Sequence, residues 1–172
     1  DAQTLSVDVP KIVVNAEQIK SAEQIIANIA GGEASKPWVL LNPNASDMLP
    51  LRKWPTERFM ELGKKFLGEN STCTLILTGA PSEKGSCEQI QKEFSSSRVI
   101  SLAGHTTLVE LMVIYSLSDL LITNDSGPGH FASMTNLKTI VMFGPEIPQL
   151  FVPLGENVHA IWKNLICSPC VN

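Results

Sequence analysis

Short runs of apolar residues alternate along this chain with longer segments in which apolar residues recur every three or four positions. Runs rich in Val, Ile, Leu and Thr are typical of buried strands, and the longer spacing predicts amphipathic helices. We expect strands at Trp38–Leu41, Thr72–Thr78, Arg98–Leu102, Asp119–Thr123, Lys138–Phe143 and Val158–Trp162. We expect helices at Ala16–Ala30, from Thr56 onward, at Ser82–Phe94, after Thr107, and from near Pro128 to about Asn136. This alternation predicts an α/β fold with a doubly wound parallel sheet.

Several of the expected helices carry signals for their ends. Gly31 and Gly32 follow the first helix, and glycine commonly ends a helix in the left-handed conformation. Thr56 is expected to cap the second helix through its side chain. Thr107 and Glu110 form a T-x-x-E capping box in front of a later helix. These signals place the helix ends independently of the apolar spacing.

Polar loops rich in Gly and Pro follow the expected strands. They contain NPNAS, TGAPSE, AGHTT, NDSGPGH and FGPEIPQ, whereas the connections from helices back to strands are plainer. Parallel strands end at one edge of a sheet, and open α/β sheets bind ligands in the crevice outside those ends. The asymmetry predicts that the functional site lies where these loops meet.

The segment TNDSGPGH, residues 123–130, joins one of these strands to a helix. Such a turn presents free main-chain N–H groups and the positive end of a helix dipole, about half a charge. Ser126 and Gly127 are therefore candidates for binding a phosphate. The alternative is a capped turn without a ligand, in which Asp125 or Ser126 is the N-cap and Pro128 lies in the first turn.

The composition is that of one globular domain of 172 residues, with 44% hydrophobic and 17% charged residues. No apolar run approaches the ~18 residues that a transmembrane helix requires. A net charge of -4 without a Lys or Arg cluster argues against nucleic acid as a partner. The sequence lacks G-x-G-x-x-G, the P-loop, G-x-S-x-G and any metal-ligand spacing of its histidines. NAD enzymes, P-loop ATPases, acyl hydrolases and zinc hydrolases are thus disfavoured, and we expect neither metal nor cofactor.

The cysteines Cys73, Cys87, Cys167 and Cys170 are too few for a disulfide scaffold and indicate a reducing compartment. Cys167 and Cys170 form a Cys-Ser-Pro-Cys pair, which is half of a metal knuckle without the other half. A thioredoxin-type pair stands at the start of a helix after an early strand. We therefore favour a structural role for this pair.

Arg52 and Lys53, in the loop after the first expected strand, are candidate cations for a diphosphate. Charge-assisted hydrogen bonds contribute about 1.5–3 kcal/mol each, and a helix N-terminus adds ~0.3–1 kcal/mol, which is enough to stabilise a leaving diphosphate without Mg²⁺. Because a carboxylate repels phosphate, Asp125 fits better on sugar hydroxyls or as the cap of its helix. The alternative is that Arg52 and Lys53 are solvated loop charges.

In motif order and spacing the chain resembles the C-terminal domain of glycosyltransferase family 9, the ADP-heptose:lipopolysaccharide heptosyltransferase family. The resemblance runs from about Pro37 to Cys170 and is carried by NPNAS, RKWP, LTGAPSE, SLAGHTTLVEL, LLITNDSGPGHFAS and VMFGP. Its most specific part is the D-S-G-x-x-H core from Asp125 to His130. It implies a GT-B fold, in which two Rossmann-like domains face a cleft and the C-terminal one holds most of the nucleotide-sugar.

The resemblance also implies roles for single residues. Asp125, Ser126, Gly127 and His130 match the family's residues around the diphosphate and donor sugar. Glu83 matches the acid that binds the hydroxyls of the nucleoside ribose. The alternative for Glu83 is that it caps its own helix, where an acid in the first turn is favourable.

At one position the chain departs from the family's pattern. The family usually has Lys-x-Trp-Pro, and this chain has Arg52 three positions before Pro55, with Lys53 next to it. Arginine presents a rigid fork of donors, whereas lysine is a point charge. The sequence leaves open which of the two contacts the diphosphate.

The reaction implied by the resemblance is the inverting transfer of a heptosyl group from ADP-heptose to the lipopolysaccharide core. The family's general base is an aspartate of the N-terminal domain, so we expect no catalytic base in this chain. We expect residues 1–36 to be a linker and helix and residues 37–172 to be the donor-binding domain, with the catalytic N-terminal domain absent from this chain, which is cut from a longer protein. The isolated domain is then expected to bind donor without turnover.

The resemblance further implies the partners and the location. The expected partners are a nucleotide-sugar, the N-terminal half of the same polypeptide and a lipid-linked or oligosaccharide acceptor. The expected location is the cytoplasm, with peripheral attachment to the cytoplasmic face of the inner membrane. Two alternatives stay open: a non-catalytic nucleotide-diphosphate-binding or interaction module, and another GT-B enzyme such as a nucleotide-sugar 2-epimerase.

Overall fold

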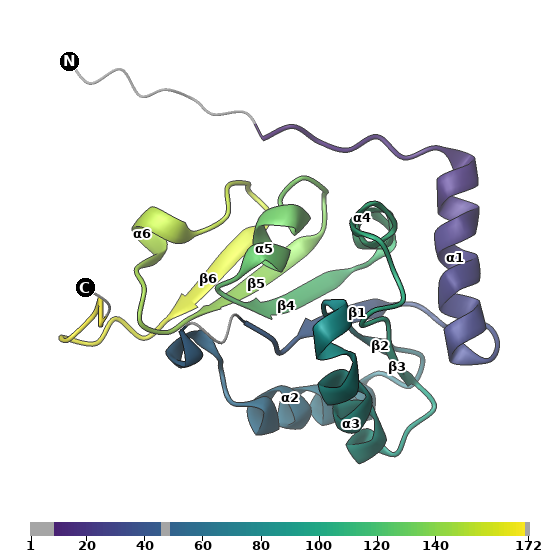
Figure 1. Ribbon diagram of the computed structural model, residues 1–172, viewed down its shortest axis with the longest axis horizontal. Coiled ribbons are helices and arrows are strands. Elements are labelled where there is room, and N and C mark those ends of the chain that lie inside the picture. The colour runs from purple at the N-terminus through teal and green to yellow at the C-terminus, as the bar shows by residue number, and fades with distance from the viewer. Residues whose placement is uncertain (1–8, 46–48, 171–172) are drawn as a thin grey trace.

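The computed structural model describes residues 9–45 and 49–170. Within this part of the chain, six strands form one sheet in the order β3-β2-β1-β4-β5-β6 (Figure 1). They are β1 Trp38–Asn42, β2 Thr74–Leu77, β3 Val99–Ser101, β4 Leu120–Asn124, β5 Lys138–Phe143 and β6 Val158–Trp162. All neighbouring strands are parallel, which confirms the predicted doubly wound sheet.

Helices lie on both faces of this sheet (Figure 1). The helices are α1 Ala16–Ala30, α2 Thr56–Glu69, α3 Lys84–Phe94, α4 Leu108–Leu117, α5 Gly127–Ala132 and α6 Pro148–Phe151, with short 3-10 helices η1 Pro50–Arg52 and η2 Pro81–Glu83. In the view of Figure 1, α2 and α3 lie below the sheet and α4 and α5 lie above it. None of the helices among residues 9–45 and 49–170 combines the length and the apolarity needed to cross a membrane.

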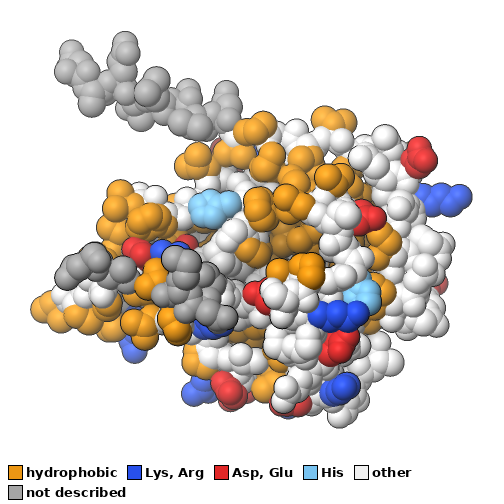
Figure 2. Space-filling model, in the orientation of Figure 1, with side chains coloured by type: hydrophobic (Ala, Val, Ile, Leu, Met, Phe, Trp, Pro, Cys, Tyr) orange, Lys and Arg blue, Asp and Glu red, His pale blue; other side chains and the backbone are white. Residues whose placement is uncertain are grey.

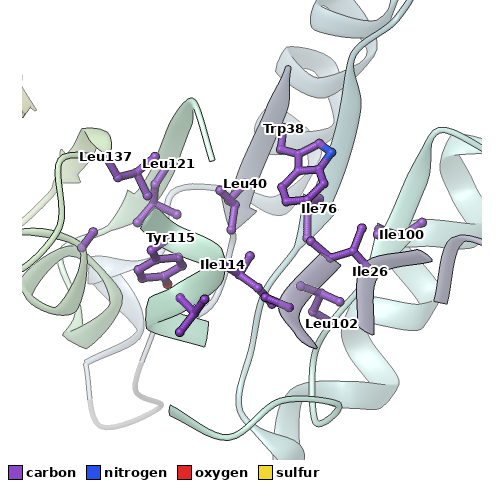
Figure 3. Close-up of a cluster of buried hydrophobic side chains, with 13 residues drawn as sticks. Ile26, Trp38, Leu40, Ile76, Ile100, Leu102, Ile114, Tyr115, Leu121 and Leu137 are labelled. Carbon is purple, nitrogen blue, oxygen red and sulfur yellow. The ribbon is translucent and has the colours of Figure 1, made fainter. Parts of the chain in front are cut away.

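The core consists of one layer on each face of the sheet, because successive strand residues point to opposite faces. Trp38 and Leu40 belong to the layer shown in Figure 3, together with Ile26 of α1 and Ile114 of α4. The neighbouring β1 residues, such as Leu41, belong to the other layer, between the sheet and α2 and α3. Strands buried on both faces explain the continuous apolar runs in the sequence.

Helix α1 is part of the same core as the sheet. Ala22 and Ile26 are each only 1% exposed, and α1 packs against α4. Asn15 caps its N-terminus through a reciprocal capping box, and Gly31 ends it in the left-handed conformation with φ 71°. The predicted end at Gly31 is confirmed. Helix α1 therefore contributes to the stability of the sheet.

Some predicted helix boundaries are confirmed and others are wrong. Thr107 and Glu110 form the predicted capping box of α4. Thr56, however, does not cap α2: it is the first helical residue, and the extended residue Pro55 holds the cap position without a side-chain hydrogen bond.

The helix after β4 is also shorter than expected and ends at Ala132 rather than near Asn136. The hydroxyls of Ser133 and Thr135 donate to the carbonyls of His130 and Ala132, respectively, at 2.8 and 2.7 Å. Such side-chain bonds compete with further helical turns.

The direction of the strand order reverses between β1 and β4. From β1 the sheet continues through β2 to β3, and from β4 it continues through β5 to β6. In open α/β sheets, a ligand binds outside the carboxyl ends of the strands at this point. The loops after β1 and β4 therefore frame the expected binding crevice.

Candidate functional site

A cleft of about 360 Å³ opens at the carboxyl ends of the strands, above the reversal between β1 and β4. Asn44 follows β1, Glu83 follows β2, and Ser126 follows β4, and all three line the cleft. Leu108 and Leu111 of α4 and Phe131 of α5 form an apolar wall. An apolar wall with a few polar groups is the usual lining of a small-molecule site.

Leu108 at the start of α4 shows how this wall differs from the core. Leu108 lies in the apolar sequence LVELMVIYSL of α4, yet it is 49% exposed. Figure 2 shows hydrophobic side chains gathered on the outer surface over α4, α5 and α6, whereas charged side chains lie mostly around α2 and α3. An exposed leucine beside the cleft offers an apolar surface to a flat ligand group such as a nucleobase.

Glu83 lies at the end of η2 and lines the cleft. Its Oε2 atom accepts a hydrogen bond of 2.7 Å from the main-chain N–H of Ala80. Glu83 therefore caps its own turn, as expected if it has a capping role. Its Oε1 atom accepts no hydrogen bond from a described residue. One carboxylate oxygen thus holds the turn, while the other is without a donor among the described residues.

Ser126 and Gly127 begin α5 directly after β4. Ser126 has the N-cap position, but its hydroxyl donates to the main-chain oxygen of Asn124 at 3.2 Å rather than capping the helix. Neither the Ser126 N–H nor the Gly127 N–H donates to another described residue, and Pro128 has no N–H. Two adjacent N–H groups therefore remain for an anion at the edge of the cleft. Because α5 has only 6 residues, these N–H groups matter more than its dipole.

Arg52 and Asp125 lie outside this cleft, in a charged cluster beside it. Arg52 Nη2 donates to Glu146 Oε1 at 2.8 Å, and Arg52 Nε lies 3.7 Å from Asp125 Oδ2. Arg52 is therefore not a solvated loop charge: it joins η1 to the loop after β5 and to the end of β4. Burial raises the pKa of the Asp125 carboxyl; Arg52 and His130 oppose this rise, and Glu146 adds to it.

Lys53 and His130 are exposed side chains. Arg52 and Lys53 line a second hollow of about 300 Å³, between η1 and the ends of β5 and β6. His130, on α5, lies near enough to Asp125 for its charge to lower the pKa of that carboxyl. The candidate residues thus form two groups. Glu83 and Ser126 line the cleft, with Gly127 next to Ser126, and the cluster around Arg52 lies on the side of β5.

Two residues of this region were not identified by the sequence analysis, Asn124 and Glu146. Asn124 is fully buried and donates to the main-chain oxygens of Pro43 and Asn44 at 2.9 and 3.3 Å. Glu146 is 8% exposed and lies in FGPEIPQ, the loop after β5. Asn124 is the polar last residue of β4, and Glu146 is the acid of the Gly- and Pro-containing loop after β5.

The cysteines do not contribute to the cleft. Cys73 and Cys87 are buried, and Cys167 and Cys170 are exposed with their Sγ atoms 4.0 Å apart. The main-chain N–H of Cys170 donates to the oxygen of Pro145 at 2.9 Å, which holds the Cys-Ser-Pro-Cys segment against the loop after β5. Within the described residues, no group of three or more His, Cys, Asp or Glu side chains is placed to hold a metal ion.

The family model of glycosyltransferase family 9 (heptosyltransferase) matches residues 2–172. This chain belongs to glycosyltransferase family 9. It is 31% identical over 134 residues to lipooligosaccharide heptosyltransferase 2 of Campylobacter jejuni, an alignment that covers 76% of this chain and 41% of the relative. The chain therefore spans less than half the length of this curated relative.

Solved structures of the family share the fold. The chain is similar to E. coli ADP-heptose LPS heptosyltransferase II with a TM-score of 0.79 and 22% identity, over 96% of this chain and 48% of that one. It is similar to an E. coli heptosyltransferase WaaC with ADP with a TM-score of 0.64 and 19% identity, over 92% of this chain and 46% of that one. Both matches confirm a half of the GT-B architecture as the fold of this chain.

Proposed function

We propose that this chain is the donor-binding half of an inverting glycosyltransferase that transfers a heptosyl group from ADP-heptose to the lipopolysaccharide core. The observation that carries the proposal is the cleft at the strand-order reversal, which Glu83 and Ser126 line, with the N–H group of Gly127 next to Ser126. The C. jejuni relative is named as a lipooligosaccharide heptosyltransferase, and one structural neighbour was solved with ADP.

The lining of the cleft supports a particular orientation of the nucleotide. The apolar wall of Leu108, Leu111 and Phe131 suits the base, and the open Oε1 atom of Glu83 suits the ribose hydroxyls. The N–H groups of Ser126 and Gly127 then face the diphosphate. Each part of the nucleotide meets a protein group of complementary chemistry.

In the proposed mechanism, this half holds the donor and stabilises the departing diphosphate. Hydrogen-bond donors fixed in place before the reaction stabilise charge that develops on a leaving group. The N–H groups of Ser126 and Gly127 supply such donors without a metal ion, whereas Arg52 is held by Glu146 and Asp125. The general base that deprotonates the acceptor hydroxyl belongs to the N-terminal half of the same polypeptide.

The proposal includes the partners and location of the full protein. The acceptor is a lipid-linked or oligosaccharide molecule bound mainly by the other half. We place the enzyme in the cytoplasm, acting peripherally at the cytoplasmic face of the inner membrane.

Calorimetric titration of this chain with ADP, GDP and UDP, first in EDTA and then with Mg²⁺, tests the proposal. We expect ADP to bind with micromolar to millimolar affinity in EDTA and Mg²⁺ to change that affinity little. If none of the three diphosphates binds under either condition, the proposed function is wrong.

A matched pair of variants tests the orientation of the nucleotide. Glu83→Gln keeps an oxygen for the Ala80 N–H, because glutamine also serves in a capping box, but it loses the charge that faces the ribose. We expect it to weaken ADP binding by about tenfold, the effect of a lost charge-assisted hydrogen bond. Glu93→Gln, on the exposed surface of α3, is the control and should bind ADP as the wild type does.

A further inference from the structure

We propose that Glu146, in the loop after β5, is a specificity residue that binds hydroxyl groups of the donor sugar together with Asp125. This inference rests on the proposed function and assigns a residue to the sugar end of the same donor. It concerns the cluster of Arg52, Asp125 and Glu146, which lies beside the cleft rather than within its lining.

Three separate segments bring this cluster together. Arg52 belongs to η1 after β1, Asp125 follows β4, and Glu146 follows β5. The guanidinium is 2.8 Å from Glu146 Oε1 and 3.7 Å from Asp125 Oδ2. The side chains of Arg52 and Glu146 are 27% and 11% exposed, so the ion pair is well shielded from solvent. Arg52 thereby fixes the position of Glu146.

The two carboxylates have more acceptor oxygens than the described residues supply with donors. Asp125 is 5% exposed, and its buried Oδ2 atom accepts no hydrogen bond from the described residues; the equally unpaired Nε atom of Arg52 lies 3.7 Å away, beyond hydrogen-bond distance. Glu146 Oε2 accepts none from the described residues either. Ionised carboxylates only accept hydrogen bonds, and buried acceptors are nearly always paired. The cluster therefore complements a group that carries hydrogen-bond donors.

This chemistry distinguishes the sugar from the diphosphate. Phosphate oxygens are acceptors and negatively charged, so they would be repelled by Asp125 and Glu146 and would leave the carboxylate oxygens unpaired. Sugar hydroxyls are neutral and each carries one donor. Two acids that share one arginine are therefore better suited to bind the hydroxyl groups of a sugar ring than to bind a phosphate group.

The order of the strands places the cluster where the sugar should lie. Glu83 follows β2, Asn44 follows β1, Ser126 follows β4 and Glu146 follows β5, and these strands are consecutive in the sheet. Neighbouring strands are about 4.8 Å apart. A donor with its ribose near Glu83 and its diphosphate at Ser126 extends in the direction of β5, where its next group is the sugar.

The test compares the affinity of this chain for ADP-heptose with its affinity for ADP, in the wild type and in Glu146→Gln. We expect the variant to lose about tenfold in affinity for ADP-heptose and less than about twofold for ADP, since one charge-assisted hydrogen bond to the sugar is lost. Glu156→Gln, in an exposed loop, is the control and should leave both affinities unchanged. Glu146→Asp keeps the charge but withdraws the carboxylate by one methylene. It should likewise lose affinity for ADP-heptose and keep its affinity for ADP.

The outcomes separate this inference from the function on which it rests. If the Glu146 variants lose affinity for ADP and ADP-heptose equally, or keep the wild-type ratio of the two affinities, Glu146 does not have the proposed role. Either result leaves the proposed binding of ADP in place. Failure of the wild type to bind ADP overturns the proposed function itself. A thermal melting curve of each variant checks that the variant is folded at the temperature of the binding measurement.

Discussion

The main-chain N–H of Trp54 donates a hydrogen bond of 2.8 Å to the Oδ1 atom of Asn124. The two residues are 70 positions apart in the sequence. Through its Nδ2 atom, Asn124 also donates to the oxygens of Pro43 and Asn44. One buried amide at the end of β4 thus holds both ends of the loop after β1, the loop that carries Arg52.

Replacing Asn124 by alanine should therefore destabilise the fold and loosen the position of Arg52. The change leaves a donor and two acceptors of the main chain without their partner, and we expect the free energy of unfolding to fall by about 2–3 kcal/mol. Urea denaturation of both proteins measures the difference. Asn136→Ala, at an exposed turn, should change stability by less than ~0.5 kcal/mol. Equal stability of Asn124→Ala and the wild type would show that the loop is held by other contacts.

The sequence predicts the centre of the sheet well because β1, β2 and β3 are buried at every position and β4 at all but its first. The expected ranges for β5, β6 and α1 agree with the structure at both ends. Apolar spacing and Gly31 mark the ends of α1, and a polar loop follows β5. β6, in contrast, is an edge strand whose central residues are exposed. The misplaced cap at Thr56 has a local cause, since the extended Pro55 holds the cap position that a threonine side chain would otherwise occupy.

The site is predicted less completely, because its contacts join distant parts of the chain. The sequence identifies Glu83, Ser126 and Gly127 from their places after strands, and their roles in binding remain predictions. It does not reveal that Arg52 pairs with Glu146, which lies 94 positions away. Such a pairing depends on β1 and β5 lying on either side of β4, which only the strand order shows.

Two glycines of α2 provide a matched test of the packing beneath the sheet. A Cβ atom at Gly63 would lie 2.7 Å from Phe94 Cζ and 3.0 Å from Leu75 Cδ1, whereas nothing lies within 4 Å of one at Gly68. Gly63→Ala should therefore lower the free energy of unfolding by about 1–2 kcal/mol, since overpacking outweighs the gain in helix propensity. Gly68→Ala gains that propensity without a clash and should raise stability by up to about 1 kcal/mol. Denaturant unfolding of both variants measures the two changes in the free energy of unfolding. Changes of the same sign would contradict the expected clash at Gly63.

Asp125 should reduce the stability of the unliganded protein at neutral pH. Burial is the main cause that raises the pKa of its carboxyl in the folded state above the ordinary value of 3.8. An acid with a raised folded-state pKa favours folding when it is protonated and opposes folding when it is ionised. Asp125→Asn, which is neutral and nearly the same size, should then be more stable than the wild type at pH 7, by about 0.5–2 kcal/mol, the usual gain from such changes at functional sites.

The pH dependence of this gain tests its cause. As the pH falls through the folded-state pKa towards 3.8, the wild-type carboxyl becomes protonated and the advantage of Asp125→Asn should disappear. Chemical denaturation of both proteins across this range measures the difference, and Glu156→Gln should show no such trend. A variant that is less stable than the wild type at pH 7 would mean that the attraction of Arg52, 3.7 Å away, outweighs the cost of burial. Asp125 and Arg52 would then form a stabilising ion pair, and the Asp125 carboxylate would not be one that is retained for a ligand at a cost in stability.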